Sequence, residues 1–147
     1  MSSLFTKIIA GEIPGRFLWS DDVAVAFLTI APLTPGHALV VSRAEVCQWT
    51  ESDDTLLEHL VRVAKRIGAA QQAEWDATRI GVLIEGFEVD HLHIHVWPAF
   101  SAADFDVHNV DHDPDPAALD ESAERIRVRL IEDGFAEHVP ADVSRPL

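Results

Sequence analysis

The sequence predicts a single domain that mixes helices with strands, and three observations support this prediction. The chain has 147 residues, which suits one domain with a sizeable core. Residues 91–98 read H-L-H-I-H-V-W-P, and this strict alternation of histidine with apolar residues is typical of a half-buried strand. Residues 52–72 place apolar side chains every three or four positions, which predicts an amphipathic helix.

The composition narrows the class of protein. The formal net charge is −14, so the surface repels phosphate backbones, which argues against nucleic-acid binding but allows a small phosphorylated substrate in a donor-rich cleft. The one cysteine, Cys47, excludes an internal disulfide, and we expect it to be a buried or half-buried thiol in a reducing compartment. No signal peptide is apparent, and no apolar stretch approaches the ~20 residues of a membrane span. We therefore expect a soluble, cytoplasmic protein without membrane contacts.

The first third of the chain predicts a short helix and three strands. Residues 3–10 repeat apolar side chains at i and i+4, and a glycine and a proline just beyond them end the helix. Strands are predicted at 17–20, 23–30 and 37–41. A turn at Asp21-Asp22 separates the first two strands, and a proline-rich loop precedes the third.

The middle of the chain predicts the longest helix and a strand pair. Ser52 is the expected N-cap of the helix at 52–72, and His59 is expected on its solvated face. Residues 79–85 carry apolar side chains on both faces, which predicts a central strand. Its short connection to residues 91–98 predicts an antiparallel hairpin.

The last third predicts a loop, a helix and a tail. Residues 99–116 are acidic and irregular, which predicts a surface loop or lid, and we expect His108 and His112 there to be solvated rather than metal ligands. A second helix is predicted at 117–131. The domain then spans 1–138, and residues 139–147 are expected to be a loosely held tail.

Strand alternation places His91, His93 and His95 on one face, where two chemistries are open. Three imidazoles can bind catalytic zinc, although three successive same-face positions on one strand rarely converge on one ion. Alternatively, one imidazole attacks phosphorus while the others position it and donate to phosphate oxygens. His37 follows a Pro-Gly turn at the start of another strand and could add a fourth histidine.

These motifs resemble the histidine triad (HIT) family of nucleotide hydrolases and transferases. H-L-H-I-H-V-W matches the family's His-φ-His-φ-His-φ-φ motif, where φ is apolar. The segment L-F-T-K-I-I-A-G-E-I-P resembles the family's N-terminal segment, and D-D-V-A-V-A-F-L-T-I-A-P-L-T-P-G-H-A-L-V-V resembles its central strands. The match runs from residue 4 to residue 98. The resemblance implies an α+β fold with about five antiparallel strands and two main helices, usually as a two-fold homodimer.

The resemblance also implies roles for individual residues. His93 would attack the α-phosphate of a purine nucleoside phosphate derivative to form a nucleotidyl-histidine intermediate. His95 would contact the phosphate, while His91 and His37 would hold the surrounding hydrogen bonds. The nucleotide-binding residues it implies are Leu4, Phe5, Ile8 and Phe27 at the purine, Thr29 at the ribose and Glu88 near the leaving group. From sequence alone, the four apolar residues are equally well explained as core.

The chain departs from the family at several of these positions. Many bacterial members bind zinc through a Cys-x-x-Cys that is Ser3 to Thr6 here, and a later zinc histidine falls near Glu45, so we expect no structural zinc and no required cofactor. Thr29 replaces a ribose-binding aspartate, and Ile84 a phosphate-binding asparagine. Glu88, in the shortened loop before the triad, would repel a polyphosphate leaving group and could favour a cationic amine.

Three hypotheses follow, in order of preference. The first is a HIT-like enzyme that cleaves a phosphoanhydride or phosphoramidate bond through His93. The second is a nucleotide-binding module with weak catalysis, which the changes at Thr29, Ile84 and Glu88 motivate. The third is a metal-dependent hydrolase that uses His91, His93 and His95.

Overall fold

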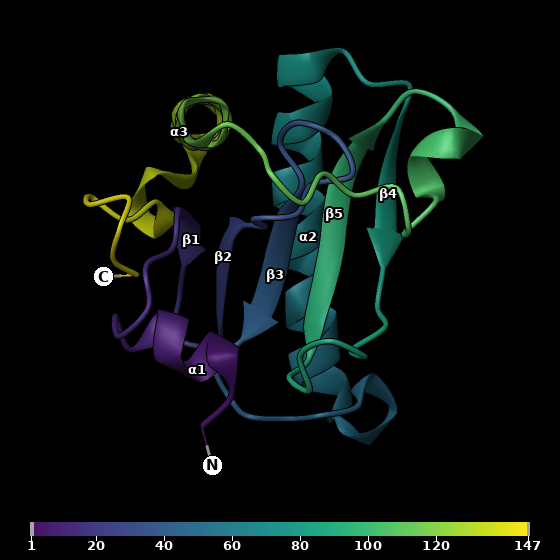
Figure 1. Cartoon of the computed structure of the whole chain (residues 1–147). Helices are drawn as coiled ribbons and strands as arrows, with labels where there is room; N and C mark the ends of the chain where they lie inside the picture. The colour runs from purple at the N-terminus through teal and green to yellow at the C-terminus, as the bar shows by residue number, and fades with distance from the viewer. Residues whose placement is uncertain (1, 147) are drawn as a thin grey trace.

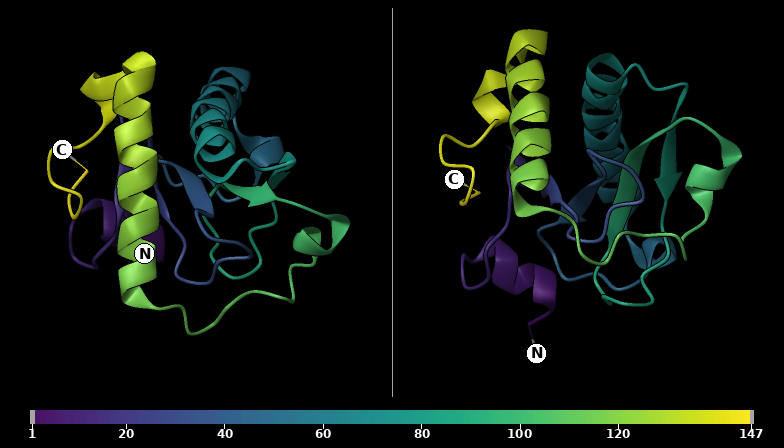
Figure 2. Two further views of the ribbon diagram at one scale, coloured as in Figure 1. Left: turned by 90° about the horizontal axis from the view of Figure 1, so that it is seen from above. Right: turned by 45° about the horizontal axis from the view of Figure 1, so that its top comes forward.

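Five strands form one antiparallel sheet in the computed structural model, which describes residues 2–146 (Figure 1). The strand order is β1-β2-β3-β5-β4. Helices α2 and α3 pack on one face of the sheet, and the short helix α1 lies on the other (Figures 1 and 2). The predicted α+β fold with five antiparallel strands is thus confirmed.

Each predicted helix and strand is present, with small shifts at its ends. The helices are α1 (Leu4–Ile9), α2 (Asp54–Trp75) and α3 (Pro116–Leu130), and the strands are β1 (Phe17–Ser20), β2 (Ala24–Leu28), β3 (Ala38–Ser42), β4 (Arg79–Leu83) and β5 (His93–Ala99). The acidic segment contains only one short helical turn, Ala102–Phe105. Further turns follow α3 at Ile131–Phe135 and Ala136–His138. None of the helices in residues 2–146 is long and apolar enough to cross a membrane.

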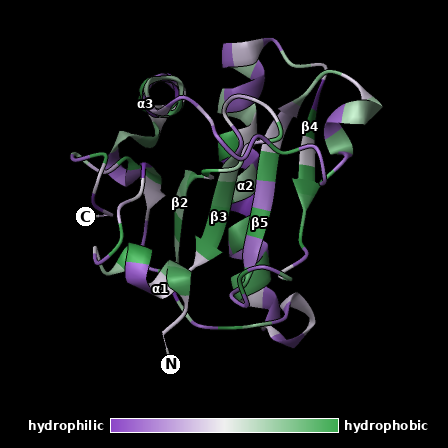
Figure 3. Cartoon of the chain, in the orientation of Figure 1, coloured by the Kyte–Doolittle hydropathy of each residue, from purple (hydrophilic) through white to green (hydrophobic). Residues whose placement is uncertain are grey.

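Strand alternation divides the apolar residues between two clusters. The larger cluster lies between the sheet and helices α2 and α3, and β5 contributes Ile94 and Val96 to it. The smaller cluster lies on the opposite face and includes Phe5 of α1 with Phe27 and Leu39. Hydrophilic and hydrophobic residues alternate along β5 (Figure 3). The histidines of this strand therefore face α1, away from the main core.

Helix α2 differs from its prediction at both ends. Asp53, rather than Ser52, caps its N-terminus, because the Asp53 carboxylate accepts the Leu56 N–H at 2.7 Å. The helix passes through Gly68 without a break and ends at Trp75, followed by Asp76 with a φ of 51°. Gly68 packs against Ile80 of β4, so its small size brings helix and sheet close together.

Strand β4 lies at the edge of the sheet, so the prediction of a central strand was wrong, although its antiparallel pairing with β5 is confirmed. The residues of β4 differ in their surroundings. Gly81 lies directly against the Trp97 ring, which leaves no room for a Cβ. Ile80 packs on the core, whereas Val82 is 57% exposed.

The tail after Val139 is held against β1, which differs from the expectation of a loose segment. Phe17 N–H donates to the Val143 carbonyl at 2.8 Å, and Ser20 Oγ donates to the Pro146 carbonyl at 2.8 Å. The buried Arg127 of α3 donates to the carbonyls of Phe17 and Pro140 at 2.7 and 2.6 Å. These bonds cover the free edge of β1 with the tail.

Two single-residue expectations were also wrong. His59 is half-buried, and its Nε2 lies 2.7 Å from Asp21 Oδ2. Cys47 is exposed, because the loop between β3 and α2 carries it outside both clusters.

Candidate active site

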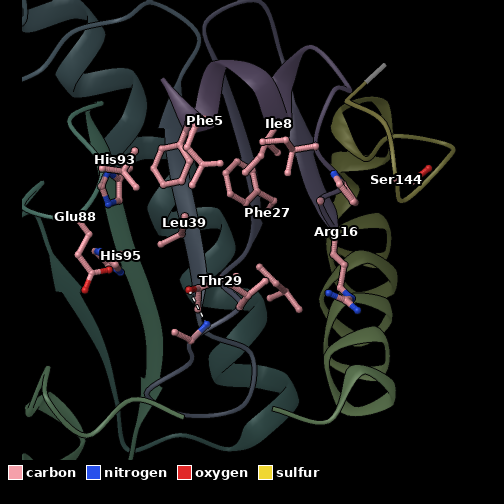
Figure 4. A pocket seen from close by; sticks show the side chains of 18 of the residues that line it. Phe5, Ile8, Arg16, Phe27, Thr29, Leu39, Glu88, His93, His95 and Ser144 are labelled. Carbon is pink, nitrogen blue, oxygen red and sulfur yellow. Dashed lines mark hydrogen bonds between the residues drawn. The ribbon is translucent and has the colours of Figure 1, made fainter. Parts of the chain in front are cut away.

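A cavity of about 500 Å³ opens on the α1 face of the sheet (Figure 4). His93 and His95 line it from β5, and all six residues predicted to bind the nucleotide line it as well, namely Leu4, Phe5, Ile8, Phe27, Thr29 and Glu88. Most of its surface is apolar, which suits a flat aromatic ligand. The four apolar residues that sequence alone could equally assign to the core are therefore walls of one cavity.

The backbone sets the tautomer of His93. Its Nδ1 lies 2.6 Å from the His91 carbonyl oxygen, and because a carbonyl only accepts, Nδ1 must carry the proton. The lone pair of the neutral ring is therefore on Nε2. Phe5 packs edge-on against the ring, with centroids 4.8 Å apart, and holds it in place. His93 thus has one nitrogen with a free lone pair at the cavity.

A second chain of hydrogen bonds sets the tautomers of His37 and His95. Leu33 N–H donates to His37 Nδ1 at 3.0 Å, so the His37 proton is on Nε2. His37 Nε2 lies 3.0 Å from His95 Nδ1 and donates to it. His95 therefore carries its proton on Nε2 and can donate it to a group in the cavity. His37 itself does not line the cavity.

The turn before His37 is held by contacts with helix α2. Gly36, with a φ of 89°, packs against the Trp75 ring, where a Cβ would come too close. Gln71 of α2 donates to the carbonyls of Gly36 and Val96 at 2.8 and 2.9 Å. Sequence reasoning missed Gln71, because only the tertiary structure places helix α2 beneath the ends of two strands.

His91 lies just before β5 and connects the triad to α1. Its Nε2 donates to the Ser42 carbonyl at 2.6 Å, so its Nδ1 accepts from Ser3 Oγ, also at 2.6 Å. Ser3 is the N-cap of α1 and accepts the Thr6 N–H at 3.0 Å. Because α1 also carries Phe5, the serine ties the histidines to one wall of the cavity.

Burial favours the neutral forms of His37, His93 and His95. It lowers the pKa of His37 from 6.5 to about 3 and that of His95 from 6.5 to about 4, with a smaller contribution from the neighbouring imidazole in each case. Burial also lowers the pKa of His93, against the opposing effect of its hydrogen bond to the His91 carbonyl. At neutral pH the site therefore holds neutral imidazoles, which can attack as nucleophiles or donate as neutral N–H groups.

Two carboxylates lie beside the histidines. Glu85 and Glu88 line the cavity, and Figure 4 shows Glu88 next to His95. Ile84, which the resemblance aligned with a phosphate contact, packs against the main core instead. Sequence reasoning missed Glu85 because it placed the phosphate contact at the neighbouring residue, Ile84. Adjacent side chains of an extended chain point in opposite directions, so Glu85 faces the cavity and Ile84 faces the core.

The opposite end of the cavity is formed by residues that the sequence did not indicate. They are Arg16, Asp120 of α3, and Val143 and Ser144 of the tail. Arg16 Nε lies 2.7 Å from Asp120 Oδ1, and Figure 4 shows Arg16 and Ser144 across the cavity from His93. These residues come from three distant parts of the chain, so no local motif marks them.

The residues at the positions of the family's zinc ligands bind one another. Glu45 Oε1 accepts the Ser3 N–H at 3.0 Å and the Thr6 hydroxyl at 2.6 Å, and Ser3 Oγ bonds His91. Zinc in proteins prefers thiolate, imidazole and carboxylate ligands, and here two of the four groups are hydroxyls. This set does not fit a structural zinc. In residues 2–146 no three His, Cys, Asp or Glu side chains form a group suited to a metal, and His108 and His112 are exposed.

Comparisons with known proteins agree with this geometry. The sequence model of the HIT domain matches residues 10–102. An adenosine 5'-monophosphoramidase of Schizosaccharomyces pombe is 34% identical over 99 residues, 67% of this chain and 74% of that protein. An uncharacterized HIT-like protein of Borreliella burgdorferi is 36% identical over 104 residues, 66% of this chain and 75% of that protein.

Solved structures share the fold over most of both chains. A HIT-like protein of Bartonella henselae, described as involved in cell-cycle regulation, aligns with a TM-score of 0.74 at 27% identity over 87% of this chain and 96% of that chain. A zinc-bound histidine triad family protein of Mycobacterium smegmatis aligns with a TM-score of 0.76 at 25% identity over 92% of this chain and 98% of that chain.

Proposed function

The chain belongs to the HIT domain family, and from this premise we propose that it is a nucleotide hydrolase or transferase that works through a nucleotidyl-histidine on His93. The bond cleaved is a phosphoramidate or phosphoanhydride at the α-phosphorus of a purine nucleotide. The observation that carries the proposal is the hydrogen bond from His93 Nδ1 to the His91 carbonyl, because it leaves the Nε2 lone pair for attack.

In the first step, Nε2 of His93 forms a bond to phosphorus while the bond from phosphorus to the leaving group breaks, and the leaving group takes up a proton from solvent. The nucleotidylated ring becomes cationic, and its Nδ1–H then donates a charge-assisted bond to the His91 carbonyl. His95 donates its Nε2–H to a phosphate oxygen. In the second step, water attacks phosphorus and gives up a proton to solvent while the bond from phosphorus to Nε2 breaks, which releases the nucleoside monophosphate and restores neutral His93.

We propose an amine as the preferred leaving group. Glu85 and Glu88 stand beside His93 and act on it electrostatically, although burial has the largest effect on its pKa. These carboxylates would repel a departing polyphosphate and attract a cationic amine. The relative in S. pombe is described as an adenosine 5'-monophosphoramidase, which is consistent with this preference.

A nucleotide-binding module with weak catalysis is the second candidate, and Thr29 favours it. The Thr29 hydroxyl accepts the Ala31 N–H at 3.2 Å within its own turn. A single hydroxyl that already accepts this hydrogen bond would hold a ribose less firmly than a carboxylate would.

We also propose that the protein needs no structural zinc and acts as a cytoplasmic two-fold homodimer. The hydrogen bonds among Ser3, Thr6, Glu45 and His91 support the first point, since they occupy the groups that a zinc ion would need. The unpaired edge of β4, with Val82 exposed, supports a second copy. Elemental analysis after dialysis should find substoichiometric zinc, whereas near-stoichiometric zinc would favour the metal-dependent hydrolase.

The proposal is tested by intact-protein mass spectrometry after brief quenching without acid. The wild type should gain one nucleoside monophosphate from adenosine phosphoramidate and less from a dinucleoside polyphosphate. His93→Ala should bind nucleotide but form no adduct, and its turnover should fall by roughly 10⁴-fold or more. His108→Ala, in the exposed acidic loop, is the matched control and should behave as the wild type.

Each outcome separates the candidates. An adduct on His93→Ala would contradict the assignment of the nucleophile. Binding without adduct or turnover in the wild type would favour the binding module. In Glu88→Gln the preference for the phosphoramidate should shrink, and an unchanged preference would contradict the role of the carboxylate.

A further inference from the structure

We propose that Arg16 and Asp120, enclosed by Val143 and Ser144 of the tail, form a subsite that reads the edge of the base and selects guanine over adenine. The inference rests on the proposed function only in that a purine nucleotide occupies the cavity. It concerns the end of the cavity opposite the histidines (Figure 4). All four residues line that cavity.

The aromatic residues between the two ends set the position of the base. With its phosphate at His93, a nucleotide would place its base against Phe5 and Phe27, whose ring centroids lie 5.5 Å apart. Figure 4 shows these rings between His93 and Arg16. The outer edge of such a base would therefore point at the pair formed by Arg16 and Asp120.

This pair presents a donor beside an acceptor. Arg16 Nε is engaged by Asp120 Oδ1 at 2.7 Å, and within residues 2–146 neither Nη group of Arg16 nor Asp120 Oδ2 has a hydrogen-bond partner. A guanidinium only donates and a carboxylate only accepts. The free atoms of the pair can therefore make one set of donor and acceptor bonds to a ligand.

Guanine has the complementary pattern, whereas adenine shares its N7 acceptor and inverts the other two positions. Guanine offers the O6 and N7 acceptors to an arginine, and its N1–H lies next to O6 and can donate to a carboxylate. Adenine carries an N6 amino donor at the position of O6 and an acceptor at N1. At these two positions adenine would set donor against donor and acceptor against acceptor, which weakens its binding by repulsion as well as by lost bonds.

The tail makes this end a defined wall. Val143 is tied to β1 through its carbonyl, and the backbone N–H and the Oγ of Ser144 both bond Asp142 Oδ1, at 2.9 and 2.7 Å. Asp120, Val143 and Ser144 lie outside the residues that match the HIT domain, 10–102. Base selection would therefore depend on the C-terminal third of this chain as well as on Arg16.

The test is calorimetric titration with GMP and with AMP, which needs no turnover. The wild type should bind GMP about tenfold more tightly than AMP. Both Arg16→Gln and Asp120→Asn should bring this ratio close to one while nucleotide binding persists. Arg129→Gln, which removes an exposed ion pair with Asp133 on α3, is the matched control and should keep the wild-type ratio.

Equal affinities for GMP and AMP in the wild type, or an unchanged ratio in both subsite variants, would overturn the inference. Failure to bind either nucleotide would overturn it as well. The mass experiment on His93 has a separate outcome. An adduct without base preference would support the proposed function and contradict the subsite. A GMP preference without any adduct would support the subsite and contradict the proposed function.

Discussion

The two ends of the cavity are built in different ways. At the histidine end, His93 and His95 take their tautomers from hydrogen bonds that lead back to main-chain atoms, the His91 carbonyl and the Leu33 N–H. At the opposite end, Arg16 and Asp120 form a partly exposed ion pair, with exposed side-chain fractions of 26% and 70%. The first end is buried and set by the backbone, whereas the second depends on side chains that tertiary contacts bring together.

The difference separates chemistry from selection. A nucleophile needs a fixed proton and a fixed ring orientation, which local backbone geometry supplies wherever the strand forms. Recognition of a base edge needs groups that can vary without disturbing that geometry, and three of the four residues proposed for it, Asp120, Val143 and Ser144, lie outside the matched domain. We expect substitutions at the histidine end to change kcat and substitutions at the opposite end to change base preference.

After loss of the nucleophile itself, the largest effect is expected from His37. In His37→Leu the ring that donates to His95 Nδ1 is lost, so His95 no longer has a fixed tautomer, and kcat should fall by roughly 100-fold with little change in KM. His37→Gln keeps an N–H that can reach the same nitrogen and should recover part of the loss. Steady-state kinetics on both variants checks this, and equal losses in both would contradict the relay.

Substitution of Arg127 tests whether the tail contributes to base preference at the Arg16–Asp120 end of the cavity. Arg127→Met leaves the carbonyls of Phe17 and Pro140 without donors, so the free energy of unfolding should fall by about 2 kcal/mol in urea denaturation. The preference for GMP should shrink as Val143 and Ser144 lose their support, while adduct formation on His93 persists. A destabilised variant that keeps the full GMP preference would show that the tail is not part of the subsite.

The buried histidines should also make the stability depend on pH. The folded-state pKa values of His37 and His95 are about 3 and about 4, against 6.5 for the free side chain, so between these values the unfolded chain binds more protons. The stabilisation from these residues is complete above pH 6.5 and is lost as the pH falls towards 4, by on the order of 1 kcal/mol per pH unit for each histidine.

Urea denaturation of the wild type and of His37→Leu between pH 7 and pH 4.5 measures this slope. The variant should show the shallower dependence, and Arg129→Gln should retain the wild-type slope. Identical slopes in the wild type and His37→Leu would mean that the buried histidine end does not set the acid sensitivity.

Local patterns determined much of the molecule. Alternation along residues 91–98 predicted the strand and the common face of its histidines, because successive side chains of any strand point to opposite sides. Apolar spacing predicted α2 and α3, and the turn residues separated β1, β2 and β3 at their observed positions. The residues implied at the nucleotide line one cavity, although their roles in binding and catalysis stay predictions.

Tertiary structure decided the remainder, because each of these features depends on contacts between distant segments. The edge position of β4 follows from the pairing order of the sheet, which no single strand encodes. The attachment of the tail depends on Arg127, which reaches both β1 and Pro140 from α3. The ion pair of Arg16 and Asp120 joins residues 104 positions apart. By itself the sequence thus determined the helices, the strands and the histidine face of β5. The packing of those elements decided which residues surround the Arg16–Asp120 end of the cavity.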